Sequence, residues 1–136
     1  MAIEDDDLRD REVWGRVTRY WYTRASHREP TVGRLYHHLA VLARPNAIQQ
    51  LFYYTKSLCV PHPFEPARNS IFTIPVFNGD QPTLRKLDAA FLQAHMILFA
   101  RRGYDDFDGV MNALLRALEA EADEAKRPRE QWIEIL

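Results

Sequence analysis

The sequence predicts an all-α protein built from antiparallel helical hairpins. Apolar residues recur at steps of three and four along most of the chain, the spacing that places them on one face of an α-helix. Strand-like alternation does not occur, apart from the short ambiguous stretch 71–77. Prolines and an Asn-Gly-Asp turn at residues 78–80 interrupt the helical pattern, and such breaks suit turns between neighbouring helices.

The first predicted helix covers about residues 8–27. Its apolar stripe, which we expect to face the core, consists of Trp14, Val17, Trp21 and Ala25. The second predicted helix begins after Thr31, whose hydroxyl suits the cap position of a helix.

The third predicted helix follows after a very short turn. The ring of Pro45 disfavours helical geometry at Arg44, and Asn46 suits the cap of the helix that follows. Two small residues, Gly33 and Ala40, allow the second helix to approach its neighbour closely. We expect the interface to be filled by Leu39, Leu42, Leu51 and Leu58.

The rest of the chain predicts one short helix and a further helical hairpin. The short helix begins at Pro66, and the hairpin consists of a helix from Thr83 to Gly103 and a second helix after it. The apolar run 132–136 starts a helix with nothing to pack against, so we expect a truncated chain. We divide the sequence into an acidic flexible N-terminus (1–8), tetratricopeptide-like helices (9–74), a loop (75–82) and a truncated hairpin (83–136).

Charge is unevenly distributed, although the formal net charge is only −1. Residues 9–68 carry ten Arg or Lys residues against four acids, whereas residues 69–136 carry eight against eleven. A basic segment beside an acidic one suits a protein that meets phosphates on one side. The alternative is that the arginines only solvate helix faces.

The chain also repeats itself weakly. The sequence YTRAS at residues 22–26 is followed by YTKSL at 54–58, an offset of 32, and Pro30 is followed by Pro63 at an offset of 33. These offsets are close to the period of roughly 34 residues in tetratricopeptide repeats, which place a proline after their second helix. We therefore expect a tetratricopeptide-like α-solenoid.

Three motifs occur in order in the first half of the chain. They read GRLYHHLAVLA at residues 33–43, LFYYTKSL at 51–58 and PFEPARNS at 63–70. Together they resemble the EST/SMG family of telomerase-associated EST and mRNA-decay SMG proteins, whose fungal relatives carry a DNA/RNA-binding domain. The resemblance covers about residues 13–74.

The resemblance implies a non-catalytic scaffold that is associated with nucleic acid in the nucleus or cytoplasm. Its expected role is that of an adaptor in nonsense-mediated mRNA decay or telomere maintenance. The implied partners are RNA or single-stranded DNA and the proteins of decay or telomerase complexes. The family's phosphopeptide-binding motif, Gly-Asp-hydrophobic-hydrophobic-Arg-Tyr, does not precede Trp14, so no phosphopeptide-binding residue is assigned. The alternatives are a general tetratricopeptide protein-interaction module without nucleic-acid contact, and a fragment without activity of its own.

Two groups of residues are candidate binding sites. The arginines of the first helix lie off its apolar stripe, and we expect phosphates to be held by Arg16, Arg19, Arg24, Lys56 and Arg68. Some of a second group should line a surface for a peptide or a base, because His37, His38, Tyr53 and Tyr54 cannot all face inward. The alternatives are that the arginines pair with neighbours such as Glu12 and that the tyrosines pack between repeats.

Motifs for catalysis and metal binding are missing from the sequence. It contains no HExxH, CxxC, Walker loop or G-x-S-x-G, so we expect no enzyme and no cofactor. Because His37 and His38 are adjacent, they diverge by about 100° on a helix and do not suit one metal ion. The single cysteine, Cys59, excludes an internal disulfide, and we expect it to be buried. No apolar stretch approaches roughly 18 residues, so no membrane span is expected.

Overall fold

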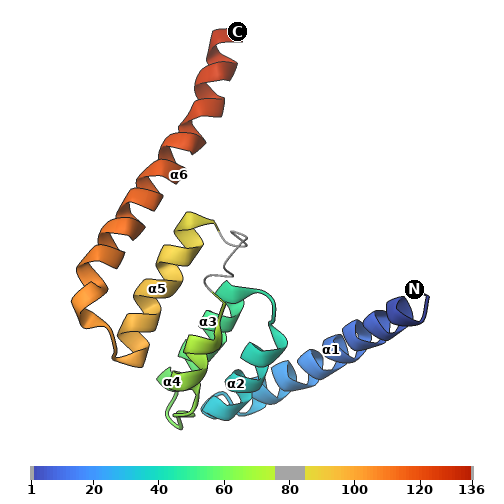
Figure 1. Cartoon of the computed structure of the whole chain (residues 1–136). Coiled ribbons are helices and arrows are strands. Elements are labelled where there is room, and N and C mark those ends of the chain that lie inside the picture. Colours follow the sequence, from blue (N-terminus) through green and yellow to red (C-terminus); the bar gives the residue numbers. More distant parts are fainter. Residues whose placement is uncertain (1, 76–84, 136) are drawn as a thin grey trace. The chain divides into compact units, whose positions relative to one another are not determined.

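The computed structural model describes the backbone of residues 2–75 and 85–135, and the side chains of residues 7–75 and 85–126. Every regular element in these ranges is a helix, which confirms the all-α fold (Figure 1). The elements are α1 (Ala2–Arg28), α2 (Gly33–Leu42), α3 (Ala47–Cys59), α4 (Ala67–Ser70), η1 (Ile71–Thr73), α5 (Lys86–Ala100), η2 (Tyr104–Asp106) and α6 (Phe107–Ile135). The chain divides into two compact units, residues 1–74 and residues 75–136.

The first helix starts earlier than the sequence analysis predicted. Because α1 begins at Ala2, the acidic segment 1–8 that we expected to be flexible is helical from its second residue. Acidic residues in the first turns of a helix are favoured by the helix dipole, and this favours extension of α1 through the acidic segment. One turn later the carboxylate of Asp7 pairs with the guanidinium of Arg11 at 3.4 Å.

The α2–α3 hairpin contains the core of the first unit. As predicted, Asn46 caps α3, because its side-chain oxygen accepts a hydrogen bond from the Gln49 N–H at 3.0 Å. Leu39, Leu51 and Tyr54 are buried. The other two leucines predicted for this interface, Leu42 and Leu58, are only half-buried.

Gly33 begins α2 at a point where backbone segments meet. Its N–H donates to the carbonyl of His62 at 2.9 Å, and a Cβ here would lie 2.7 Å from the Phe64 nitrogen and collide with the Ser57 carbonyl oxygen. The predicted close approach at Gly33 is therefore present. The predicted cap is wrong: Val32 occupies the cap position, and the Thr31 carbonyl accepts a hydrogen bond from His62, so this backbone pairing replaces a side-chain cap.

The ambiguous stretch 71–77 begins as a single turn of 3₁₀-helix. Residues Ile71–Thr73 form η1, which continues directly from α4. Ile71 and Ile74 are buried, so this turn adds apolar side chains to the core. Residues 76 and 77 lie outside the described part of the chain.

The second unit is a hairpin of α5 and α6. The helix predicted from Thr83 begins at Lys86, and Thr83 lies outside the described residues, as does most of the predicted loop 75–82. α5 ends at Ala100, after which Arg101 and Gly103 take positive φ angles of 56° and 76°. The side chains of the apolar run 132–136 are also outside the described set. Among the described residues, no helix combines the length and apolarity needed to cross a membrane.

Candidate nucleic-acid interface

A basic groove lies between α1 and the C-terminal end of α2. It has a volume of about 420 Å³. Its lining includes the apolar side chains Leu8, Val41 and Leu42, the acid Glu12, and four arginines: Arg11, Arg16, Arg19 and Arg44. We call this site the arginine groove. Each guanidinium presents five N–H donors in a planar fork that matches the oxygen atoms of a phosphate.

Arg19 ties α1 to α2 at this groove. Its Nη2 donates to the Leu42 carbonyl oxygen at 2.8 Å, which satisfies one of the carbonyls left without a partner at the end of α2. Arg16 and Arg44 form no ion pair within residues 7–75 and 85–126, and Glu12 forms none there either. The alternative pairing of the arginines with Glu12 is therefore not seen, and Arg16 and Arg44 have donors for a ligand.

Three of the four residues of the apolar stripe predicted to face the core are exposed, and the fourth, Ala25, is half-buried. Trp14 is 69 % exposed and Trp21 is 60 % exposed, because α2 packs against a different side of α1. Together with their exposed neighbours these side chains form the aromatic face of α1, which consists of Val13, Trp14, Val17, Tyr20 and Trp21. Arg24 lies against this face: its Nη1 donates to the Tyr20 hydroxyl oxygen at 2.9 Å.

The other two predicted phosphate ligands lie elsewhere in the first unit. The Nζ atom of Lys56, on α3, lies 4.7 Å from the ring centroid of Tyr36 and 5.5 Å from that of Phe52. Arg68, on α4, pairs with Glu65 at 3.1 Å. The structure therefore brings Arg16 and Arg19 together in the arginine groove, whereas Arg24, Lys56 and Arg68 are not part of its lining.

The histidines and tyrosines predicted to line a binding surface differ in how far they are buried. Tyr54 is 1 % exposed, so its assignment to a binding surface is wrong. Tyr53 is the preceding residue on the same helix, so its side chain points about 100° away from that of Tyr54. Tyr53 is half-exposed and packs against Phe52, with 5.2 Å between the ring centroids. His38 is covered by Tyr22 of α1, with the rings stacked at 4.8 Å.

His37 is half-buried beside aromatic rings. Its ring centroid lies 4.7 Å from that of Phe64 and 5.5 Å from that of Tyr54, and its Nε2 is 3.4 Å from the Ser70 hydroxyl oxygen. Burial lowers the pKa of His37, and the nearby charges of His38, Arg34 and Arg44 lower this pKa further. His37 is therefore half-buried among aromatic rings, and its role as a binding residue stays a prediction.

The sequence did not predict two of the arginines that line this groove. Arg11 lies eight positions before Arg19, and this spacing places both side chains on one face of the helix. The spacing could therefore have identified Arg11 as a neighbour of Arg19. Arg44 joins the groove only through the packing of α2 on α1, so no sequence signal marks it.

Cys59 was expected to be buried but is exposed at the end of α3. Within the described residues, no three His, Cys, Asp or Glu side chains are placed to hold a metal ion.

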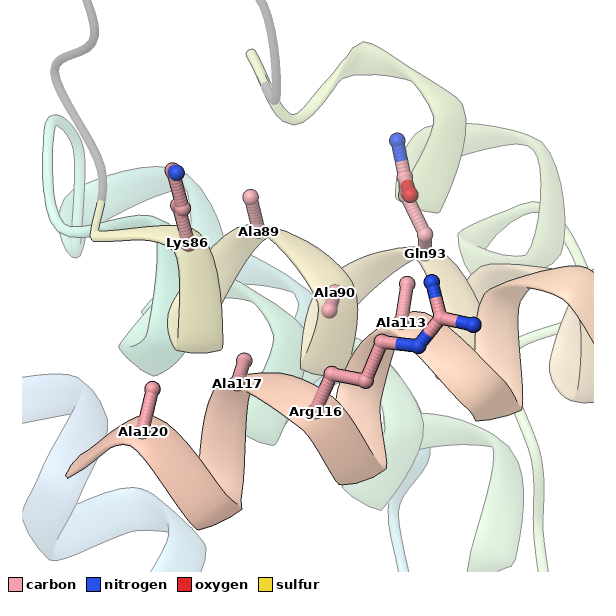
Figure 2. A pocket seen from close by; sticks show the side chains of 8 residues that line it. All are labelled: Lys86, Ala89, Ala90, Gln93, Ala113, Arg116, Ala117 and Ala120. Atoms are coloured by element: carbon pink, nitrogen blue, oxygen red, sulfur yellow. The ribbon is translucent and has the colours of Figure 1, made fainter. Parts of the chain in front are cut away.

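The second unit contains a shallow groove between its two helices. Its volume is about 480 Å³, and Figure 2 shows five alanines, two cations and Gln93 along it. The alanines are Ala89, Ala90, Ala113, Ala117 and Ala120, and the cations are Lys86 and Arg116. The alanines make most of the lining of this groove apolar, whereas Lys86 and Arg116 add two positive charges.

The first unit is thus an all-helical module with an arginine-lined groove. Residues 19–74 match the family model of the Est1 DNA/RNA binding domain, which confirms the resemblance to the EST/SMG family over this segment. The segment includes Arg19, Leu42 and Arg44 of the arginine groove and ends at the last residue of the first unit. The description of the family names nucleic-acid binding and no reaction. No curated protein and no solved structure matches the chain.

Proposed function

We propose that the first unit binds nucleic acid directly and that the arginine groove holds its phosphates. The observation that carries this proposal is the convergence of Arg11, Arg16, Arg19 and Arg44 on one groove, in a segment that overlaps the match to a DNA/RNA binding domain. Arginine binds phosphate through paired N–H donors, and each phosphate that is neutralised releases counterions. The excess of basic residues between 9 and 68 attracts the same ligand over a longer range.

The proposed role of the whole chain is that of a non-catalytic adaptor. Relatedness to the EST/SMG family supports a place in mRNA surveillance or telomere maintenance, in the nucleus or the cytoplasm, with protein partners of decay or telomerase complexes. The hairpins α2–α3 and α5–α6 support the tetratricopeptide-like part of this proposal, because such repeats are built from paired helices.

Charge reversal in the groove tests the proposal. Arg16→Glu combined with Arg44→Glu changes two arginines that form no ion pair in the described part of the chain, and it leaves the Arg19–Leu42 hydrogen bond intact. We expect weaker binding of a fluorescent single strand and a salt slope that is flatter by about 1.4, since each lost phosphate contact contributes roughly 0.7. Lys86→Glu combined with Arg116→Glu makes the same charge change in the second unit and should leave binding nearly unchanged.

The outcomes of this experiment separate the candidate functions. Equal losses from the two double variants would mean that net charge, and not the groove, governs binding. If no nucleic acid binds, the general protein-interaction module becomes the better account, and the alanine-lined groove between α5 and α6 is the feature that favours it (Figure 2). Circular dichroism of both variants should match the wild type, because the four substituted side chains are exposed.

A further inference from the structure

The aromatic face of α1 is too exposed to be part of the core of this unit. Trp14, Tyr20 and Trp21 have exposed fractions of 69 %, 53 % and 60 %. On a helix with 100° per residue, this face lies opposite the side on which Arg11 and Arg19 line the arginine groove. A concentrated apolar surface of this kind marks a binding site.

Arginines border this face. Tyr20 has Arg16 one turn before it and Arg24 one turn after it, the spacing that makes side chains neighbours on a helix. The guanidinium carbon of Arg24 lies 5.7 Å from the ring centroid of Tyr20 and 6.0 Å from that of Trp21. Arg16 also lines the arginine groove, so it connects the groove with the aromatic face.

We propose that the aromatic face of α1 stacks the unpaired bases of a single-stranded nucleic acid whose phosphates lie against Arg16 and Arg24. This inference rests on the proposed function and deepens it by naming the surface that holds the bases of the strand. Each base has a π-face that stacks on an aromatic side chain whatever its sequence, whereas the faces of bases in a duplex are covered by their neighbours.

Charge decides between a nucleic acid and a protein helix as the occupant. A polyanion supplies a counter-charge to the guanidinium groups that border the face, whereas an apolar protein helix would desolvate them without one. Asp10 is an acid on the same side of α1, one turn before Trp14. Arg9 lies beside Asp10 on this side, so the two charges offset each other there, whereas Arg16 and Arg24 give the C-terminal half of the face a net positive charge.

The test compares three labelled probes of equal length on the full chain: an oligothymidine strand, a duplex, and a strand with abasic sites in place of its bases. We expect the oligothymidine to bind at least roughly fivefold more tightly than the abasic strand for each base that stacks. It should also bind more tightly than the duplex. In a Trp132→Phe background, where Trp14 and Trp21 are the remaining tryptophans, adding oligothymidine should quench tryptophan fluorescence.

Substitutions localise the effect. Trp14→Ala combined with Trp21→Ala should lower oligothymidine affinity by roughly fivefold or more and leave abasic-strand affinity unchanged. Trp14→Phe combined with Trp21→Phe keeps two aromatic rings and should retain most of the affinity. Tyr104→Ala removes a ring that is 56 % exposed in the second unit and should have no effect. Helicity by circular dichroism should be the same in all variants.

Equal affinity for the three probes, combined with sensitivity to Arg16→Glu and Arg44→Glu, would overturn the stacking inference and leave the proposed function standing. Failure to bind any probe would overturn both. If the tryptophan-to-alanine variant binds all probes like the wild type but loses self-association in sedimentation, the face makes protein contacts and the inference is wrong.

Discussion

Replacing Gly33 by alanine tests how tightly the first unit is assembled. A Cβ at this position would lie 2.7 Å from the Phe64 nitrogen and 2.9 Å from the His62 carbonyl oxygen, and it would also collide with the carbonyl oxygen of Ser57. All three obstacles are backbone atoms, so no side chain can rotate away to relieve the contact. The segment 62–64 or the start of α2 must move instead.

The expected cost follows from these contacts. Overpacking a closely packed site costs about 1–3 kcal/mol. Movement of the backbone also weakens two hydrogen bonds, Gly33 N–H to His62 at 2.9 Å and Phe64 N–H to Ser57 at 3.0 Å, each contributing about 1 kcal/mol. We expect Gly33→Ala to lower the free energy of unfolding by about 2–4 kcal/mol, which corresponds to a fall in Tm of at least roughly 8 °C.

Two other glycines provide matched controls, because both lie within helices and have open space around the Cβ position. For Gly15 and Gly109 no heavy atom lies within 4 Å of that position. Alanine there should stabilise the helices by about 0.5–1 kcal/mol, since it reduces the conformational freedom of the unfolded chain. Urea unfolding followed by circular dichroism measures all three variants. If Gly33→Ala proves as stable as the wild type, α2 does not approach the 62–64 segment as closely as described.

Two further predictions concern the core and pH. Leu51→Ala should cost about 2–5 kcal/mol, because Leu51 is 3 % exposed, whereas Leu8→Ala at a site 58 % exposed should cost far less; equal losses in urea unfolding would contradict the assignment of faces. Because the pKa of His37 is lowered in the folded state, the unfolded chain gains this proton first, so stability is fully present above about pH 6.5 and falls as pH drops below it. His37→Gln should flatten this dependence in denaturant titrations between pH 5 and 7.5, and a dependence that this substitution leaves unchanged would contradict the burial of His37 as its cause.

Local signals in the sequence were sufficient to predict the helical fold and several of the helix boundaries. The side chain of Asn46 caps α3 because a short oxygen acceptor at that position meets the free N–H groups of the first turn. Gly33 was recognisable as a site of close approach, but the sequence did not reveal that a loop backbone would be its neighbour. The same loop also explains why Thr31 does not cap α2: the backbone N–H of His62 donates a hydrogen bond to the carbonyl oxygen of Thr31.

Which face of a helix is covered depends on tertiary packing and cannot be obtained from periodicity. The spacing of Trp14 and Trp21 correctly identified an apolar stripe, but α2 packs on another side of α1 and most of the stripe stays exposed. For the same reason, Tyr53 and Tyr54 were indistinguishable in the sequence although only Tyr54 is buried. Arg44 enters the arginine groove through the α1–α2 contact, which no local pattern encodes.

The most direct test of the account is the salt dependence of nucleic-acid binding by the wild-type chain. Fluorescence anisotropy with a labelled single strand should give a Kd tighter than about 10⁻⁴ M at low salt, the weak end of ordinary non-specific association. If the four arginines of the groove each neutralise one phosphate, the logarithm of the binding constant should fall against the logarithm of salt concentration with a slope of about −2.8. Binding weaker than this limit at low salt, or binding that salt leaves unchanged, would contradict the claim that the arginine groove holds phosphates.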